Sequence, residues 1–123
     1  MRRVVVDAGV IPGWFDPHSP HRALRSEYET GMLAILAPRH LIGDVLALIA
    51  DRVPAERLPG VGAELGRLGF QIQDPPLPTL AAWIARGLPA DRAAYAALAA
   101  GLELPLVTDD EELRRLTATV PRG

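Results

Sequence analysis

Short, continuous apolar runs recur along this chain, and a stretch with a helical pattern follows each of them. The runs are "VVV" at 4–6, "MLAILAP" at 32–38, which Pro38 ends, and "LPLVT" at 104–108. Apolar runs without polar alternation are typical of parallel strands that are covered on both faces. Parallel strands need long crossovers, which helices usually supply. The sequence therefore predicts a three-layer α/β/α fold with a central parallel sheet of four or five strands, formed by residues 1–123 as a single domain.

Two weaker strand patterns complete this expected sheet. The segment "FQIQ" at 70–73 alternates between apolar and polar residues, and "TATV" at 117–120 is the candidate edge strand. The alanine-rich segment at 90–103 is predicted as a helix with an apolar stripe through Ala94, Tyr95 and Leu98.

The helix expected after the second strand contains an unusual acid. Leu41, Val45, Leu48 and Ile49 recur at intervals of three and four, which is the spacing of one helix face. Asp44 lies beside these apolar residues rather than across the helix from them. Such an acid is either a partly exposed residue at the edge of the core or a functional one.

Composition restricts the class of protein. The formal net charge is −2, and all 13 basic residues are arginines, so any contact with nucleic acid is expected to be local. Cysteine is absent, which excludes disulfides, thiolate metal sites and cysteine nucleophiles. No apolar stretch approaches the roughly 20 residues of a membrane-spanning helix, so a cytoplasmic protein without membrane contact is expected.

Acidic residues fall where ligands bind in open parallel sheets, which is beyond the carboxyl ends of the strands. Asp7 directly follows the first apolar run, and Asp109 and Asp110 follow the last one. Asp91 stands at the start of the alanine-rich helix, and Asp44 interrupts the apolar face of another helix.

Each acid also has a local explanation. Asp7 is placed to cap a helix or to form a turn after its strand, and Asp91 to cap or charge the first turn of its helix. Thr108 and Glu111 have the spacing of a capping box. Asp44 has the weakest local explanation, since it is neither a cap nor part of a polar face.

The four acids Asp7, Asp44, Asp91 and Asp110 come from four separate segments of a fold with one natural crevice. Clustered carboxylates repel one another unless a cation holds them, so the set predicts a divalent metal site. Ligation by oxygen alone favours Mg²⁺ or Mn²⁺ over zinc.

The segment "ADRAAYAALAAGLELPLVTDDEEL" at 90–113 resembles the corresponding part of the PIN-domain family of metal-dependent nucleases. The resemblance covers nearly the whole chain and is strongest to the toxin ribonucleases of VapBC toxin–antitoxin pairs. The acids of the family fall on the four aspartates already described, and Thr108 is the usual companion of the last one. Three features differ from the family pattern: Asp44 stands where glutamate is typical, Gly9 where serine or threonine is common, and "VIPGWF" at 10–15 puts Pro-Gly into the first helix.

This resemblance implies cleavage of single-stranded RNA by water that Mg²⁺ or Mn²⁺ activates. Asp7, Asp91 and Asp110 would hold the metal, and Asp44 would bind it directly or through water. Arg39 and Arg92 are the nearby arginines that would assist a phosphate substrate, although a surface role is the simpler explanation for each.

The same resemblance implies two protein partners, an antitoxin and a second copy of the chain. The apolar segment "VIPGWF" at 10–15 and an exposed Trp83 are the candidate contacts for an antitoxin. Burial in the core is the simpler explanation for Ile11 and Ile84. Trp14 and Phe15 are explained either by packing, in the core or against a partner, or by stacking on a base.

Other classes of α/β protein are less compatible with the sequence. Response-regulator receivers and haloacid-dehalogenase phosphatases normally depend on a lysine, and this chain has none. A P-loop is absent. The serious alternative is a catalytically weak or inactive PIN-fold module for binding or dimerisation, which Asp44 and Gly9 favour. The histidines show no ligand spacing and are predicted at the surface: His18, His21 and His40.

Overall fold

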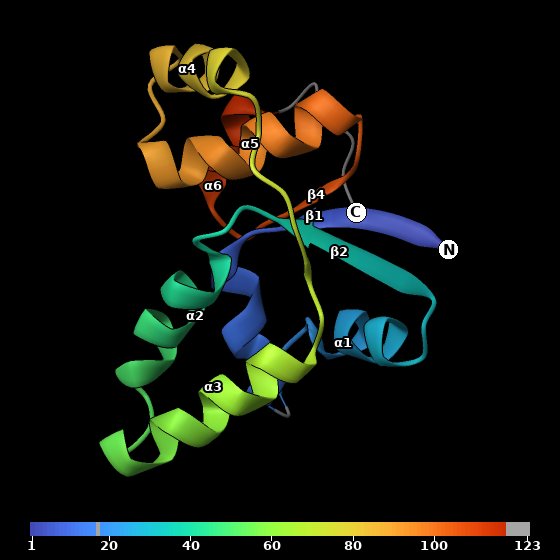
Figure 1. The fold of residues 1–123 in the computed structure, drawn as a ribbon, viewed down its shortest axis with the longest axis vertical. Helices are drawn as coiled ribbons and strands as arrows, with labels where there is room; N and C mark the ends of the chain where they lie inside the picture. The colour runs from blue at the N-terminus through green and yellow to red at the C-terminus, as the bar shows by residue number, and fades with distance from the viewer. Residues whose placement is uncertain (17, 118–123) are drawn as a thin grey trace.

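A parallel sheet of four strands lies at the centre of the protein, whose computed structural model describes residues 1–16 and 18–117 (Figure 1). The strands lie in the order β3-β2-β1-β4 and all pairs are parallel. Their bounds are β1 Arg2–Val6, β2 Leu33–Ala37, β3 Gln71–Ile72 and β4 Leu106–Val107. This confirms the predicted α/β class. The candidate fifth strand at 117–120 lies outside the described residues except for Thr117, which is in a turn.

Helices cover both faces of the sheet, which makes three layers (Figure 1). One layer contains α4, α5 and α6, and the other contains α1, α2 and α3 together with the 3₁₀-helix η1. Their bounds are η1 Ala8–Phe15, α1 Arg22–Glu29, α2 Leu41–Ala50, η2 Ala55–Arg57, α3 Leu58–Arg67, α4 Leu77–Ala85, α5 Ala90–Leu102 and α6 Glu111–Leu116. In the described part of the chain, no helix is long and apolar enough to cross a membrane.

The apolar runs are buried because each central strand has a helical layer on both sides. Val4, Val5 and Val6 are completely buried in β1, and the whole of β2 is buried beside it. Val4 is paired with Ile35 of β2, and Val5 is paired with Leu106 of β4. Side chains of a strand alternate between the two faces, so a run that is apolar at every position requires cover on both.

The structure corrects several predictions about single apolar residues. Trp83 is buried, with the guanidinium of Arg86 over its ring at 4.2 Å, so its predicted exposure is wrong. Ile84 on the same helix is 42% exposed, whereas Ile11 is buried as expected. Leu41, Val45 and Ile49 form the buried face of α2 as predicted, but Leu48 of the same pattern is 41% exposed.

The aromatic pair near the first helix is divided between the core and its edge. Trp14 is 2% exposed and lies against Tyr28 and Phe70, with ring centroids 5.8 Å and 6.0 Å away. Core packing is therefore the explanation for Trp14. Phe15 is half-buried, with the Arg25 guanidinium 5.3 Å from its ring centroid.

The strand order places a crevice beside β1. The chain adds β2 and then β3 on one side of β1, and it returns to add β4 on the other side. The strand order thus reverses between β1 and β4, and ligands of open α/β sheets bind beyond the carboxyl ends of the strands at such a point. Asp7 and Thr108 are the first residues after these two strands.

The core of the sheet can be tested with a matched pair of isoleucine variants. Ile35→Ala removes a side chain that is 1% exposed in β2 and should lower the free energy of unfolding by about 2–5 kcal/mol. Ile84→Ala removes a side chain that is 42% exposed and should cost less than about 1 kcal/mol. Urea denaturation followed by circular dichroism measures both. Equal losses would contradict the assignment of β2 to the sheet centre.

Candidate functional site

A cleft of about 420 Å³ opens at the carboxyl ends of β1 and β4, and carboxylates dominate its polar lining. The four predicted acids all line it, although they come from four different segments. One further acid and one arginine share the cleft. The charged side chains are Asp7, Asp44, Asp91, Asp109, Asp110 and Arg92.

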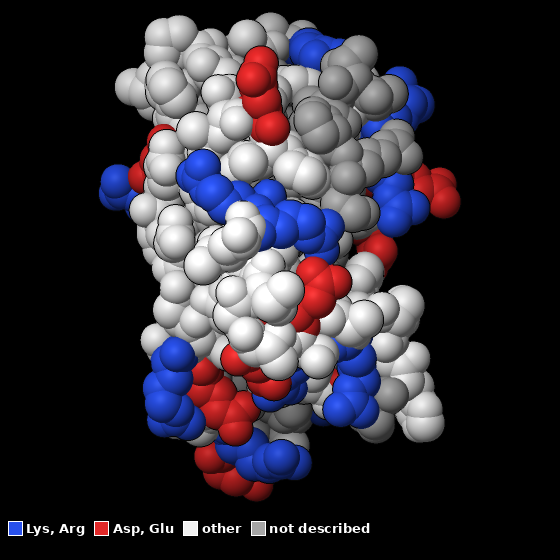
Figure 2. All heavy atoms as spheres, turned by 90° about the vertical axis from the view of Figure 1, so that its right-hand side faces the viewer, with Lys and Arg blue, Asp and Glu red and all other residues white. Residues whose placement is uncertain are grey.

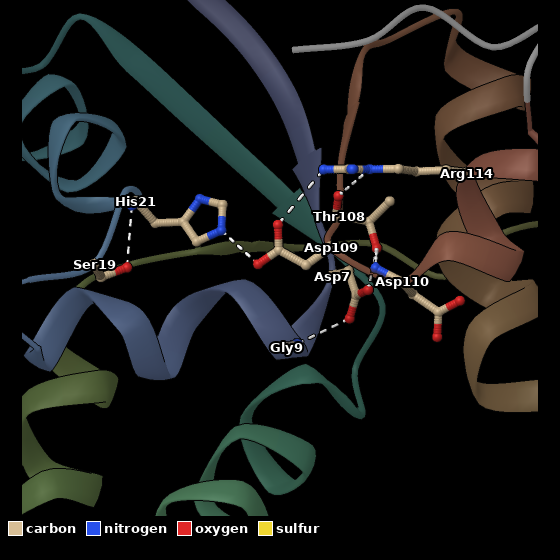
Figure 3. Close-up of polar contacts among 8 residues, drawn as sticks. All are labelled: Asp7, Gly9, Ser19, His21, Thr108, Asp109, Asp110 and Arg114. Atoms are coloured by element: carbon tan, nitrogen blue, oxygen red, sulfur yellow. Dashed lines mark hydrogen bonds and ion pairs between the residues drawn. The ribbon is translucent and has the colours of Figure 1, made fainter.

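Asp7 is fixed in place by two hydrogen bonds. Its Oδ1 accepts from the Gly9 backbone N–H at 2.9 Å, which makes Asp7 the N-cap of η1. Its Oδ2 accepts from the Thr108 hydroxyl at 2.5 Å (Figure 3). The local explanation as a cap is therefore correct, and the same carboxylate also lines the cleft.

Thr108 joins the two strand ends through its buried hydroxyl. The oxygen that donates to Asp7 also accepts from the Asp110 backbone N–H at 3.0 Å (Figure 3). Asp110 in turn caps α6, because its Oδ1 accepts from the Leu113 N–H at 2.8 Å. The predicted capping box of Thr108 and Glu111 is wrong, since α6 begins at Glu111 and Asp110 is its N-cap.

The two candidate arginines have different surroundings. Arg92 lines the cleft and places Nη1 3.2 Å from Oδ2 of Asp110 and 3.7 Å from Oε2 of Glu112. Arg39 is exposed, is not among the residues that line the cleft, and pairs with Asp74 at 2.6 Å. Hydrogen bonds from the Arg39 backbone and side chain hold the pKa of Asp74 below its usual range.

Asp109 connects the cleft to the loop before α1. Its Oδ2 lies 2.6 Å from Nε2 of His21, and its Oδ1 lies 3.6 Å from Nη2 of Arg114 (Figure 3). His21 is half-buried in this contact, so its assignment to the free surface is wrong. His18 is exposed as predicted.

His40 contacts both Asp44 of α2 and the backbone of Asp91 in α5. Nε2 of His40 donates to the Asp91 carbonyl at 3.1 Å and lies 3.6 Å from Oδ2 of Asp44. The His40 ring also packs edge-on against Tyr95, with centroids 5.1 Å apart. His40 therefore has specific partners, and the prediction of a simple surface histidine is wrong.

Tyr95 is a member of the cleft that its sequence pattern did not reveal. It is 2% exposed and lines the cleft, yet within the described residues its hydroxyl has no acceptor for its proton. Burial raises the pKa of Tyr95, and the carboxylates of Asp44, Asp7 and Asp91 raise it further, whereas the Ala8 backbone N–H opposes the shift. One feature of the sequence could have placed Tyr95 in the cleft. Tyr95 follows Asp91 by four residues, and residues at that spacing share a helix face.

The donors at this cleft match a hard divalent cation in chemistry. They are carboxylate oxygens, and one buried hydroxyl beside them is unpartnered. The arrangement is not preformed: over residues 1–16 and 18–117, no group of three or more acidic or histidine side chains is placed to hold a metal ion. Metal binding at this cleft would require side-chain rearrangement, and Asp110 in particular would have to share or release Arg92.

No protein-family model matches the sequence, and no curated protein matches it either. The chain is similar to a solved structure, the crystal structure of PAE2754 from Pyrobaculum aerophilum, with 25% sequence identity and a TM-score of 0.68. The alignment covers 94% of this chain and 86% of that one. The likeness supports the fold over nearly the whole chain.

The hydrogen bonds of Thr108 predict a specific loss of stability. Thr108→Val keeps the shape of the side chain but leaves the Asp7 carboxylate and the Asp110 N–H without this partner. The free energy of unfolding should fall by about 1–3 kcal/mol. Thr79→Val, on the partly exposed face of α4, is the control and should change it by about 0.5 kcal/mol or less. Equal effects in urea denaturation would show that the Thr108 hydroxyl does not hold the two strand ends together.

Proposed function

We propose that this protein is a Mg²⁺- or Mn²⁺-dependent endoribonuclease of the PIN type that hydrolyses phosphodiester bonds of single-stranded RNA. One observation carries the proposal: Asp7, Asp44, Asp91 and Asp110, from four separate segments, line a single cleft at the switch point of a parallel sheet. Asp7 and Asp110 also cap helices, but capping does not require four like charges to meet in one cleft. A cation is the ordinary reason for such convergence.

The residues of the cleft have distinct parts in this proposal. A bound cation would activate water and neutralise charge on the phosphate. Asp7 would be its most rigid ligand, because Gly9 and Thr108 already fix both of its oxygens. Asp44 is 39% exposed and less restrained, which suits a carboxylate that binds the cation through water or orients the attacking water.

On one face of the molecule and within the cleft, the arrangement of charges agrees with local rather than extended contact with RNA. On the face that Figure 2 shows, basic side chains lie among acidic ones and do not form a continuous basic surface. Within the cleft, Arg92 supplies a positive charge, and the exposed side chain of Leu48 supplies an apolar contact for a base or ribose. A short single strand that enters the cleft fits these features better than a duplex lying across the surface.

A second candidate is a PIN-type module that binds a partner without cutting RNA. The ion pair between Arg92 and Asp110 favours this binding module, because the guanidinium is paired with a carboxylate that a metal would need as a ligand. Asp44 and Gly9, where glutamate and serine or threonine are usual, point the same way. This candidate predicts a folded protein that neither binds Mn²⁺ at the cleft nor cleaves RNA.

The two protein partners remain part of the proposal, but the contacts suggested for an antitoxin need revision. Ile11, Trp14 and Trp83 are buried and cannot form an exposed contact surface. Apolar side chains are instead exposed on β3 and α4, where Ile72 is 50% exposed and Leu77 76% exposed. A contact with an antitoxin or with a second copy of the chain would use exposed side chains of this kind.

The nuclease proposal predicts loss of activity in Asp7→Asn. This variant keeps the size of the side chain and removes the charge that would bind the cation, so cleavage of single-stranded RNA with Mg²⁺ or Mn²⁺ should fall by at least about a hundredfold. A gel assay on a labelled, unstructured RNA measures the rate.

Asp51→Asn is the matched control. Asp51 is exposed, ends α2 and is not among the residues that line the cleft, so this variant should cleave at the wild-type rate. Activity that survives both chelation of divalent metal and Asp7→Asn would come from a contaminating nuclease. Absence of wild-type cleavage with either metal would overturn the nuclease proposal and leave the binding module.

A further inference from the structure

The two tyrosines of this chain differ in one respect that is informative about the cleft. The Tyr28 hydroxyl donates to the backbone carbonyl of Leu68. The Tyr95 hydroxyl is as buried as the apolar core around it, yet within the described residues it has no acceptor for its proton. An unsatisfied buried hydroxyl costs stability, so a second state of the cleft that satisfies it would be favoured.

Carboxylates surround this hydroxyl, and they differ in their capacity to accept a further hydrogen bond. Asp7 already accepts at both oxygens, from Gly9 and from Thr108. Asp91 is exposed at the start of the helix that carries Tyr95. Asp44 lies on α2, on the other side of the cleft, and its carboxylate has only the 3.6 Å contact with His40 among the described residues. Asp44 is therefore the acid across the cleft from Tyr95 that retains an available acceptor.

We propose that Tyr95 is a positioning residue of the cleft, whose hydroxyl donates a hydrogen bond to the Asp44 carboxylate when a divalent cation is bound. The inference rests on the proposed metal site and names a residue that orients one of its ligands. Carboxylates that bind metals are usually held by hydrogen bonds of their own, and loss of such a partner typically weakens the site. The bond would also give the Tyr95 hydroxyl an acceptor, so cation binding would offset the cost of burying that hydroxyl.

A hydrogen bond from Tyr95 would compensate for the short side chain of Asp44. An aspartate reaches less far than a glutamate, so its carboxylate needs a fixed direction in order to serve a cation in the cleft. Tyr95 stands on α5, across the cleft from α2, and its hydroxyl is the buried, uncharged donor on that side. Donation from Tyr95 would draw the Asp44 carboxylate away from His40 at the rim and into the cleft.

The test compares two phenylalanine variants by titration calorimetry with MnCl₂ in the absence of RNA. Tyr95→Phe removes only the unpartnered hydroxyl, and it should weaken Mn²⁺ binding about three- to tenfold without lowering the melting temperature of the metal-free protein. Tyr28→Phe removes a hydroxyl that has a partner. It should lower the melting temperature and leave Mn²⁺ affinity unchanged.

A double-variant cycle tests whether Tyr95 acts through Asp44. Asp44→Ala should weaken Mn²⁺ binding, and adding Tyr95→Phe to it should weaken binding no further, because the acceptor is already gone. An additive loss would overturn the pairing with Asp44. Wild-type Mn²⁺ affinity in Tyr95→Phe, or a loss of metal-free stability like that of Tyr28→Phe, would overturn the inference while leaving the metal site in place. Failure of the wild-type protein itself to bind Mn²⁺ would overturn the proposed metal site and this inference together.

Discussion

The hydrogen bond between the Thr108 hydroxyl and the Asp7 carboxylate holds together the end of the molecule where the cleft opens. Parallel pairing brings the ends of β1 and β4 side by side, and this bond then fixes the first residue beyond each strand. The same hydroxyl accepts from Asp110, which caps α6, and the same carboxylate caps η1. Two helices, two strands and two of the five cleft acids thus meet at one partly buried contact between side chains 101 positions apart in the chain.

Much of this fold could be predicted because the sheet is parallel and covered on both faces. Strands in that environment are apolar at every position, so the runs in β1 and β2 were recognisable without any structure. The burial of individual side chains was less predictable. Trp83 is buried while its neighbour Ile84 is exposed, since the packing of α4 on α5 determines the inward face. Trp83 and Ile84 are adjacent large apolar residues of α4, so the sequence alone does not show which of them faces α5.

The acids of the cleft could be predicted as a set, but their interactions could not. Each follows a strand or begins or interrupts a helix, and those positions are local features of the sequence. The partners are not local: Arg92 pairs with Asp110 of another segment, and His21 reaches Asp109 from the loop before α1. Tyr95 looked like one residue of an apolar stripe, and only the packing of α5 against β1 reveals a buried hydroxyl near carboxylates.

The central claim is that this acidic cleft holds a divalent cation, and anomalous diffraction from a crystal soaked in Mn²⁺ tests it most directly. The account predicts a manganese peak within coordinating distance of Asp7 and of at least one more of Asp44, Asp91 and Asp110. It also predicts that the Asp44 carboxylate turns toward Tyr95 in that crystal. A peak only at other places on the surface, or a cleft without manganese in which Arg92 still pairs with Asp110, would contradict the claim.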